Sequence, residues 1–132
     1  MEKIIVQIGW CDNYCAASDE ILGCVACSDT IEGIKKEYRS ALDFHIKGML
    51  EDGDELPEKL KNEYELVFEL DTSAMLHSLD GIVTRKAIAK VTGINEALLT
   101  HYANGFRKPR PVQRQKIIDG IHQIGRELTL IG

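Results

Sequence analysis

The feature that most constrains the fold of this chain is a change in hydrophobic periodicity between residues 71 and 72. Before it, apolar and polar residues alternate in short runs, most regularly over residues 64–70, and such alternation is typical of half-buried β-strands. After it, apolar residues recur at steps of three and four, the period of helices that bury one face. A length of 132 residues suits one ordinary domain or two small ones. We therefore expect two domains, residues 1–71 and residues 72–132.

The first domain is expected to have the element order β-β-β-α-β, an α+β unit in which one helix lies on a small sheet. The expected strands are Lys3–Trp10, Tyr14–Ala17, Cys24–Ser28 and Tyr64–Leu70. Asp29 is expected to cap the helix, with Glu32 reaching back, and Gly53 to end it in a left-handed conformation. The polar residues 54–62 are expected to form a loop. The inward stripe of the helix is expected to contain Ile31, Ile34, Tyr38, Leu42, Ile46, Met49 and Leu50.

The second domain carries four short helical patterns and no strand pattern. They are Ser73–Leu79, Arg85–Thr92, Glu96–Asn104 and Pro111–Leu128, the last with an inward stripe of Ile117, Ile118, Ile121, Ile124 and Leu128. Thr84 and Asn95 are suited to cap the second and third helices. Gly93 permits a sharp turn between those helices, and Ile94 can anchor the turn in the core. This is the sequence form of a helix-turn-helix.

Residues 84–109 resemble the helix-turn-helix of the phage repressors of the Cro/CI type. The resemblance includes the small residue Ala89, the pair Gly93-Ile94, the apolar Leu99, the aromatic Tyr102 and the trailing sequence Asn104-Gly105-x-Arg107-Lys108-Pro109. It implies that residues 72–132 form an all-α, lambda-repressor-like domain that binds operator DNA. The alternative is a helical hairpin used only for packing.

Positions on the two central helices predict separate roles in DNA binding. The side chains expected to face base edges in the major groove, at the start of the second helix, are Glu96, Ala97, Thr100 and His101. Five cationic side chains on the preceding helix and the following loop are expected to contact phosphates: Arg85, Lys86, Arg107, Lys108 and Arg110. For each of them the alternative is a merely solvated side chain.

The first domain resembles the HicB family of antitoxins. The residues that carry this resemblance are Gly23-Cys24, Thr30-Ile31-Glu32-Gly33, the helix through Tyr38-Arg39 and Ala41-Leu42, and the run Leu50-Glu51-Asp52-Gly53-Asp54-Glu55-Leu56-Pro57. The resemblance implies a truncated ribonuclease-H-like fold that binds a HicA-like toxin, a small basic ribonuclease that cleaves messenger RNA, and masks its active site.

The two resemblances together predict an antitoxin that also represses its own operon. Such a protein is expected to be a homodimer or a higher even oligomer, because each helix-turn-helix reads only a short half-site. The alternative is a stand-alone transcriptional repressor whose first domain senses a small molecule or only oligomerises.

The distribution of charge agrees with two different partners. Residues 1–71 hold 7 Lys and Arg against 17 Asp and Glu, a balance of −10, whereas residues 72–132 hold 9 against 4, a balance of +5. An acidic surface can match and steer a basic, RNA-binding partner, and a basic surface can bind a polyanion. Ordinary solubilising charge is the alternative.

Other functional classes have less support. The four cysteines, Cys11, Cys15, Cys24 and Cys27, have zinc-like spacing, but on a strand Cys24 and Cys27 point to opposite faces, so we expect free thiols and no metal. The first strand carries no carboxylate for a metal-dependent nuclease, and the histidines are scattered. We expect no enzymatic activity and no cofactor. The lack of a secretory or membrane-spanning segment predicts a cytoplasmic protein with no membrane contact.

Overall fold

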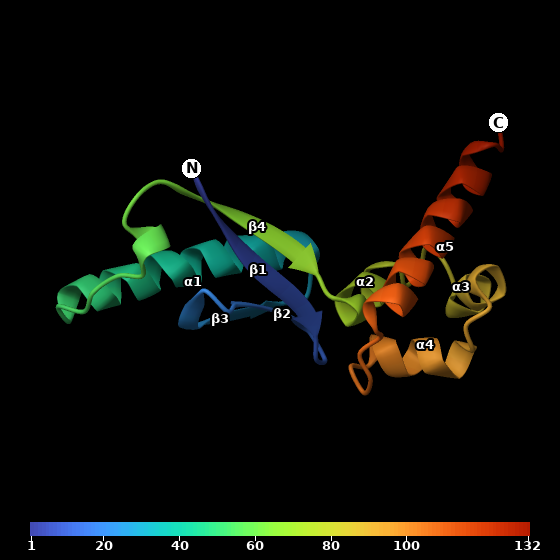
Figure 1. Cartoon of the computed structure of the whole chain (residues 1–132), viewed down its shortest axis with the longest axis horizontal. Helices are drawn as coiled ribbons and strands as arrows, with labels where there is room; N and C mark the ends of the chain where they lie inside the picture. Colours follow the sequence, from blue (N-terminus) through green and yellow to red (C-terminus); the bar gives the residue numbers. More distant parts are fainter. The chain divides into compact units, whose positions relative to one another are not determined.

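The computed structural model describes all 132 residues and contains one four-stranded sheet, five α-helices and one short 3-10 helix. This mixed composition is compatible with the expected α+β class. The chain divides into two compact units, Met1–Asp71 and Thr72–Gly132, so the division lies at the change of periodicity in the sequence. All four strands belong to the first unit (Figure 1). No helix of the protein combines the length and the apolar character that crossing a membrane requires.

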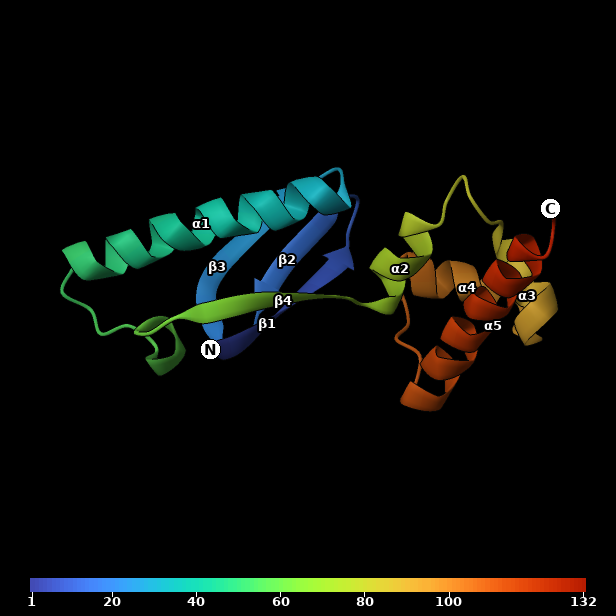
Figure 2. The same ribbon diagram turned by 90° about the horizontal axis from the view of Figure 1, so that it is seen from above.

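The first unit is a sheet with one long helix on one of its faces (Figures 1 and 2). Its elements are β1 (Glu2–Trp10), β2 (Tyr14–Ser18), β3 (Ile21–Ser28), α1 (Ile31–Glu51), η1 (Glu58–Leu60) and β4 (Tyr64–Leu70). The order of strands in the sheet is β3-β2-β1-β4, with β1–β2 and β2–β3 antiparallel and β1–β4 parallel. A parallel pair needs a long crossover, and α1 with the following segment supplies it.

The core of this unit lies between α1 and the β3–β2–β1 part of the sheet. The largest fully buried side chains are Ile4, Val6 and Ile8 from β1 and Ile34, Tyr38 and Leu42 from α1. Period-two alternation places the β1 residues on one face, and steps of four place the α1 residues on one stripe. The helix lies over β3 and β2 rather than over β4 (Figure 2), so the apolar residues of β4 remain half-buried.

The start of α1 differs from the expectation. Thr30, not Asp29, is the N-cap: its backbone is extended and its side-chain oxygen accepts a hydrogen bond from the Gly33 N–H at 2.9 Å. The helix begins at Ile31, so Asp29 lies one residue too early to cap it. The expected left-handed end at Gly53 is confirmed, with φ of +73° and N–H groups of Gly53 and Asp54 donating to the carbonyls of Leu50 and Met49.

Three other details of the first unit correct the sequence interpretation. Leu50 was expected on the inward stripe but is 60% exposed, because the end of α1 extends past the sheet (Figure 2). Strand β3 begins at Ile21 and runs through Gly23, whose φ of +84° accommodates an irregular stretch of pairing that a sequence pattern reads as a break. The expected loop contains η1, which buries Leu60.

The second unit contains only helices: α2 (Thr72–Ser78), α3 (Arg85–Thr92), α4 (Glu96–Ala103) and α5 (Pro111–Thr129). Seven buried residues form its core: Leu76, Ile88, Ile94, Leu99, Tyr102, Ala103 and Ile117. Pro111 occupies the first turn of α5, where its missing N–H costs nothing. The expected burial of Leu128 is wrong: it is 55% exposed, because α5 continues beyond the helices that cover Ile117 (Figure 1).

Candidate nucleic-acid interface

Helices α3 and α4 have well-defined N-termini. The Thr84 side-chain oxygen accepts a hydrogen bond from the Ala87 N–H at 3.0 Å, and the Asn95 Oδ1 accepts one from the Ala97 N–H at 2.8 Å. Both caps are those expected from the sequence, and each satisfies a backbone donor that the first turn of a helix leaves free. Because α3 and α4 are only eight residues long, such caps are an important part of what defines their ends.

The turn between α3 and α4 is fixed from both sides. Gly93 has φ of +75°, a conformation that a side chain would disfavour, and its N–H donates to the Ala89 carbonyl at 2.8 Å. The Thr92 hydroxyl donates to the Ile88 carbonyl and accepts from the Ile94 N–H. Ile94 itself is buried in the core, as expected. These contacts hold the two helices at a defined angle.

One side of α4 faces solvent. Glu96, Ala97 and His101 are exposed and Thr100 is half-buried, whereas Leu99, Tyr102 and Ala103 point into the core. The structure therefore brings the four predicted base-facing residues together on one side of one helix, with two of them on its first turn. Whether they contact DNA stays a prediction.

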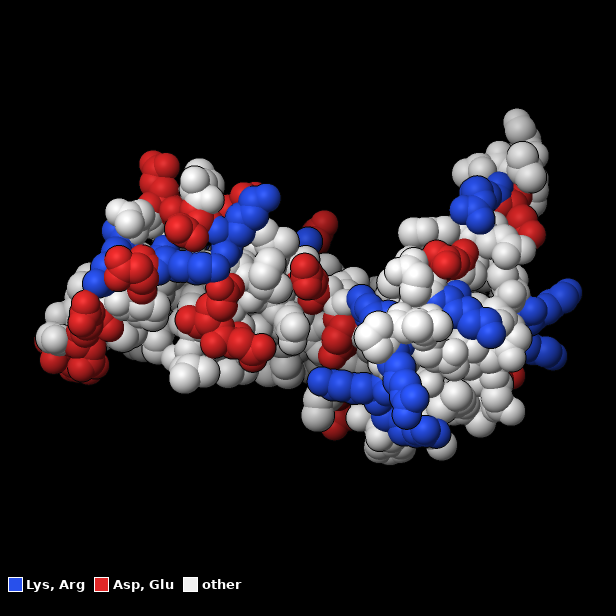
Figure 3. Space-filling model, in the orientation of Figure 1, with Lys and Arg blue, Asp and Glu red and all other residues white.

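The predicted phosphate contacts fall into two groups. Lys86, Arg107, Lys108 and Arg110 are exposed, and a group of Lys and Arg side chains lies over the loop between α4 and α5 (Figure 3). Arg85 differs, because it is half-buried and its guanidinium lies 3.4 Å from the Asp80 carboxylate. Asp80 is also 3.3 Å from His77, so Arg85 is part of an internal cluster and is less available to a phosphate than the other four.

Sequence reasoning missed Phe106, which is 76% exposed in this basic loop. Its ring centroid lies 6.1 Å from that of His101, and its N–H donates to the His101 carbonyl at 2.9 Å. The contact places an aromatic ring beside the predicted base-facing side of α4. The signal available in the sequence was an aromatic residue directly before Arg107 and Lys108, in a loop that has no core to bury it.

The first unit carries an acidic surface instead. Asp and Glu side chains lie along its visible face in Figure 3. Lys59 pairs with Glu20, and Lys61 lies 2.8 Å from Glu55, so two of the seven cations of this unit are already matched by its own carboxylates. The carboxylates of β4, Glu65 and Glu69, are exposed at the edge of the sheet.

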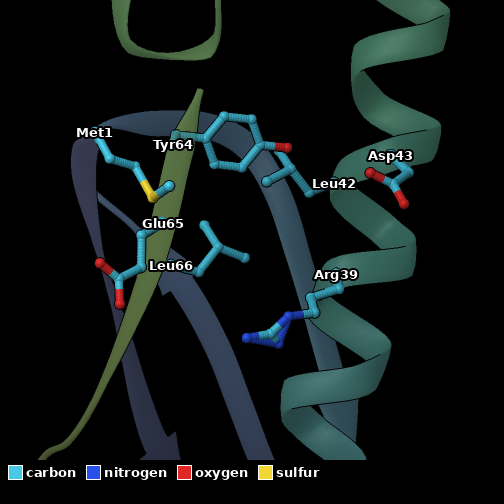
Figure 4. A pocket seen from close by; sticks show the side chains of 7 residues that line it. All are labelled: Met1, Arg39, Leu42, Asp43, Tyr64, Glu65 and Leu66. Carbon is cyan, nitrogen blue, oxygen red and sulfur yellow. The ribbon is translucent and has the colours of Figure 1, made fainter. Parts of the chain in front are cut away.

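A groove of about 440 Å³ runs between α1 and β4 in the first unit (Figure 4). Arg39 reaches into it from α1, and its guanidinium lies 5.2 Å from the centroid of the Phe68 ring. Tyr64 contributes its ring from the opposite side; partial burial raises the pKa of its hydroxyl, and the nearby Asp43 carboxylate raises this pKa further. The rest of the lining consists of three apolar side chains and two carboxylates: Met1, Leu42, Leu66, Asp43 and Glu65.

The cysteines do not converge on one site. Cys24 is buried and faces α1, whereas Cys27 is exposed on the other face of β3, so the expected separation of these two residues is confirmed. The sequence interpretation overlooked that Cys27 lies directly opposite Cys15 across the β2–β3 pair. No three His, Cys, Asp or Glu side chains lie close enough together to hold a metal ion.

Comparisons with known proteins assign no family. The sequence matches no family model. It is 39% identical over 46 residues to a protein of Haemophilus phage HP1 (strain HP1c1) described as "Uncharacterized 14.9 kDa protein in rep-hol intergenic region". The matched segment covers 35% of this chain and 35% of the phage protein, so the chain spans about a third of the length of that relative.

Proposed function

We propose that this protein is an antitoxin of the HicA/HicB type, which neutralises a ribonuclease toxin through residues 1–71 and represses its own operon through residues 72–132. The observation that carries the proposal is the capped α3–turn–α4 pair, which presents four adjacent side chains to solvent from a fixed position. A buried Ile94 and a left-handed Gly93 hold this pair rigid, and rigidity is what direct reading of base edges requires.

The exposed side of α4 supplies groups that suit base edges. With the start of α4 in the major groove, the Glu96 carboxylate accepts a hydrogen bond from a cytosine amino group. Ala97 contacts a thymine methyl group, and the Thr100 hydroxyl donates or accepts. His101 and the adjacent Phe106 ring lie at the far end of the same surface.

The basic side chains of the second unit supply affinity that does not depend on sequence. Lys86 precedes this surface, and Arg107, Lys108 and Arg110 follow it. Each phosphate contact releases condensed counterions, so the affinity for DNA should fall steeply as salt increases. Arg85 contributes only if it leaves Asp80.

The arrangement of the first unit supports the antitoxin part of the proposal. Three antiparallel-paired strands, one crossover helix and a parallel fourth strand are what a truncated ribonuclease-H-like fold would contain. The balance of −10 in residues 1–71 favours a basic partner, and the exposed Glu65 and Glu69 offer it an acidic sheet edge. Nuclease activity of the chain itself would need several carboxylates that converge on a metal ion, and no three His, Cys, Asp or Glu side chains are arranged in this way.

The end of α5 supports a homodimer. Ile121 and Ile124 pack against the core of their own unit, whereas the apolar residues that follow them, Leu128, Leu130 and Ile131, are 55%, 82% and 80% exposed. Leu128 is mostly exposed in a single chain, and a second copy of α5 would cover it. Two copies about a two-fold axis would present two α4 helices to the half-sites of an inverted repeat, spaced about one turn of DNA or ~34 Å apart.

Sedimentation of the full chain tests the dimer. Replacing Leu128 by Glu should shift the protein to monomers, because two carboxylates would meet in the paired surface. Val112→Glu introduces the same charge at the other end of α5, at a residue that is 83% exposed, and should leave the oligomer unchanged. A monomeric wild-type protein at micromolar concentration would contradict the dimer.

Binding to the promoter of its own gene tests the DNA-binding half. Fluorescence anisotropy is measured against salt for that DNA and for a scrambled sequence. Thr100→Ala should lose about 1–3 kcal/mol only on the specific DNA. Lys108→Ala should weaken both complexes and reduce the salt slope by about one. Lys47→Ala, which removes an exposed cation from the first unit, is the matched control.

Equal, salt-insensitive curves for the wild type and all three variants would mean that the second unit is a packing or dimerisation element.

The toxin-binding half is tested separately with a short basic ribonuclease encoded beside this gene. Full-length protein should suppress its RNA cleavage, with faster association at low salt. The double variant Glu65→Lys, Glu69→Lys should lose suppression, whereas Glu127→Lys in the second unit should not. A ribonuclease that stays fully active in the presence of the wild-type protein would refute the proposed antitoxin function.

The groove between α1 and β4 favours a second candidate function, a stand-alone repressor that senses a small molecule. Arg39 and the Tyr64 hydroxyl would contact polar groups of such a molecule, while Leu42 and Leu66 would contact an apolar body (Figure 4). The Asp43 and Glu65 carboxylates line the same groove and favour a molecule without net negative charge. The candidate requires that a small amphipathic compound without net negative charge changes DNA affinity in the wild type and not in Arg39→Ala. No response to any such compound, together with toxin suppression, would eliminate it.

A further inference from the structure

The cysteine pair of the β2–β3 hairpin has a defined geometry that no part of the proposed function uses. Cys15 and Cys27 are directly opposed in the antiparallel register, and their Sγ atoms lie 2.7 Å apart. A disulfide has an S–S distance of about 2.05 Å and joins residues whose Cα atoms are about 4.4–6.8 Å apart. Directly opposed residues of antiparallel strands meet this requirement without any movement of the backbone.

We propose that Cys15 and Cys27 form a redox modification site, at which a low-molecular-weight disulfide such as oxidised glutathione converts the two thiols into one reversible cross-strand disulfide. The inference is independent of the proposed function. It depends on a pair of cysteines set by strand register and not on any single reactive residue.

The location of the pair makes it accessible to an oxidant. Strand β3 is at the edge of the sheet, and α1 covers only one face of that sheet (Figures 1 and 2). Cys27 is exposed and points away from that face, because it lies three residues along the strand from the buried Cys24. Cys15 is half-buried beside it. Its hydrogen bond with Cys27 raises the pKa of the Cys15 thiol to about 11, so Cys15 stays protonated at neutral pH. Cys27, the more exposed of the two thiols, is therefore the one that a small disulfide reaches first.

The reaction proceeds by two exchanges. The Cys27 thiolate attacks one sulfur of the small disulfide, an S–S bond forms on Cys27, and one small thiolate leaves. Cys15 then loses its proton and attacks the Cys27 sulfur, and the second small thiol departs. The protein loses two electrons and two protons in total, and the small disulfide is reduced to two thiols.

The other two cysteines are not part of this site. Cys24 is buried on the opposite face of β3, and Cys11 lies in the turn between β1 and β2. Cys11 is near enough to Cys15 to raise the pKa of the Cys15 thiol. Cys11 is therefore the competing partner for a disulfide with Cys15 that the experiment must exclude.

The new bond would close a ring over residues 15–27 and hold the edge strand β3 to β2. A covalent link restricts the unfolded chain, so the oxidised first unit should unfold at a higher urea concentration than the reduced one. An exposed disulfide at a sheet edge is also open to attack by small thiols, which makes the change reversible.

The experiment uses the full chain in buffers of defined ratios of reduced to oxidised glutathione. After acid quenching and alkylation, mass spectrometry should show the loss of two hydrogen atoms and a Cys15–Cys27 linked peptide in the wild type and in Cys11→Ser. Cys15→Ser should instead accumulate one glutathione on Cys27. Addition of excess reduced glutathione should restore four free thiols in the wild type.

Unfolding followed by Trp10 fluorescence provides the second readout. Trp10 is the last residue of β1, and its ring centroid lies 4.9 Å from that of Tyr14 at the start of β2, so its fluorescence reports on this sheet. Oxidation should raise the urea midpoint of the Trp10 fluorescence transition in the wild type and in Cys11→Ser, and not in Cys15→Ser. The proposal is overturned if the wild type keeps four thiols under these conditions, if the linked peptide contains Cys11, or if glutathione accumulates on Cys27 of the wild type without formation of the link.

Discussion

Gly120 of α5 is the residue at which a single added methyl group should test the packing behind the turn between α3 and α4. A Cβ atom at this position would collide with the Cγ2 methyl of Thr92, closer than real Cβ atoms approach any neighbour. The Thr92 side chain cannot rotate away, because its hydroxyl donates to the Ile88 carbonyl at 2.7 Å and accepts from the Ile94 N–H.

The same helix contains its own control. Gly125 lies on α5 five residues later, and a Cβ atom there would meet nothing within 4 Å. Replacing glycine by alanine inside a helix stabilises by up to about 1 kcal/mol. Overpacking of a core costs about 1–3 kcal/mol. Gly125→Ala should therefore stabilise the second unit. The free energy of unfolding of Gly120→Ala should be about 1–3 kcal/mol lower than that of Gly125→Ala.

The measurement is urea unfolding followed by the backbone amide NMR signals of α3 and α5, which report on the second unit alone. Thr92→Ser removes the colliding methyl and keeps the hydroxyl, so it should recover most of the loss when combined with Gly120→Ala. A double-mutant cycle isolates this coupling. If Gly120→Ala is as stabilising as Gly125→Ala, or if the cycle shows no coupling, the close approach of α3 and α5 is not what requires glycine.

Three further outcomes are expected. Asn95→Ala removes the cap that accepts from the Ala97 N–H and should cost the second unit about 0.5–2 kcal/mol in urea unfolding, whereas Asn95→Asp should cost little. The Lys59 ammonium and the Ile5 N–H hold the pKa of the Glu20 carboxyl below its usual 4.5, so its contribution to stability is present above pH 4.5 and is lost as the pH falls through the lowered value. Acid titration of the Trp10 signal should show that Glu20→Gln flattens this loss, and an unchanged acid limb would contradict it. Protein purified under reducing conditions should carry no stoichiometric zinc by elemental analysis, because Cys24 and Cys27 point to opposite faces of β3; one zinc per chain, lost in Cys24→Ser, would show that this geometry is wrong.

Local chemistry explains what the sequence alone could predict. The caps Thr84 and Asn95, the left-handed Gly93 and the buried Ile94 all act within a few residues of one another, so their roles follow from spacing. The periodicities of two and of three to four depend only on the geometry of a strand or a helix. For the same reason the helices of the second unit and the strands of the first were expected close to where they lie.

Tertiary structure decided the features that join distant residues. The sequence does not reveal that β2 pairs with β3 in the register that opposes Cys15 to Cys27, or that Arg85 reaches Asp80. Burial of an apolar residue likewise depends on how far its neighbours extend: Leu50 and Leu128 fit the stripes of their helices but lie beyond the elements that could cover them. Periodicity predicts which side of a helix faces inward. Only the packed structure determines how far along the helix neighbouring elements cover that side.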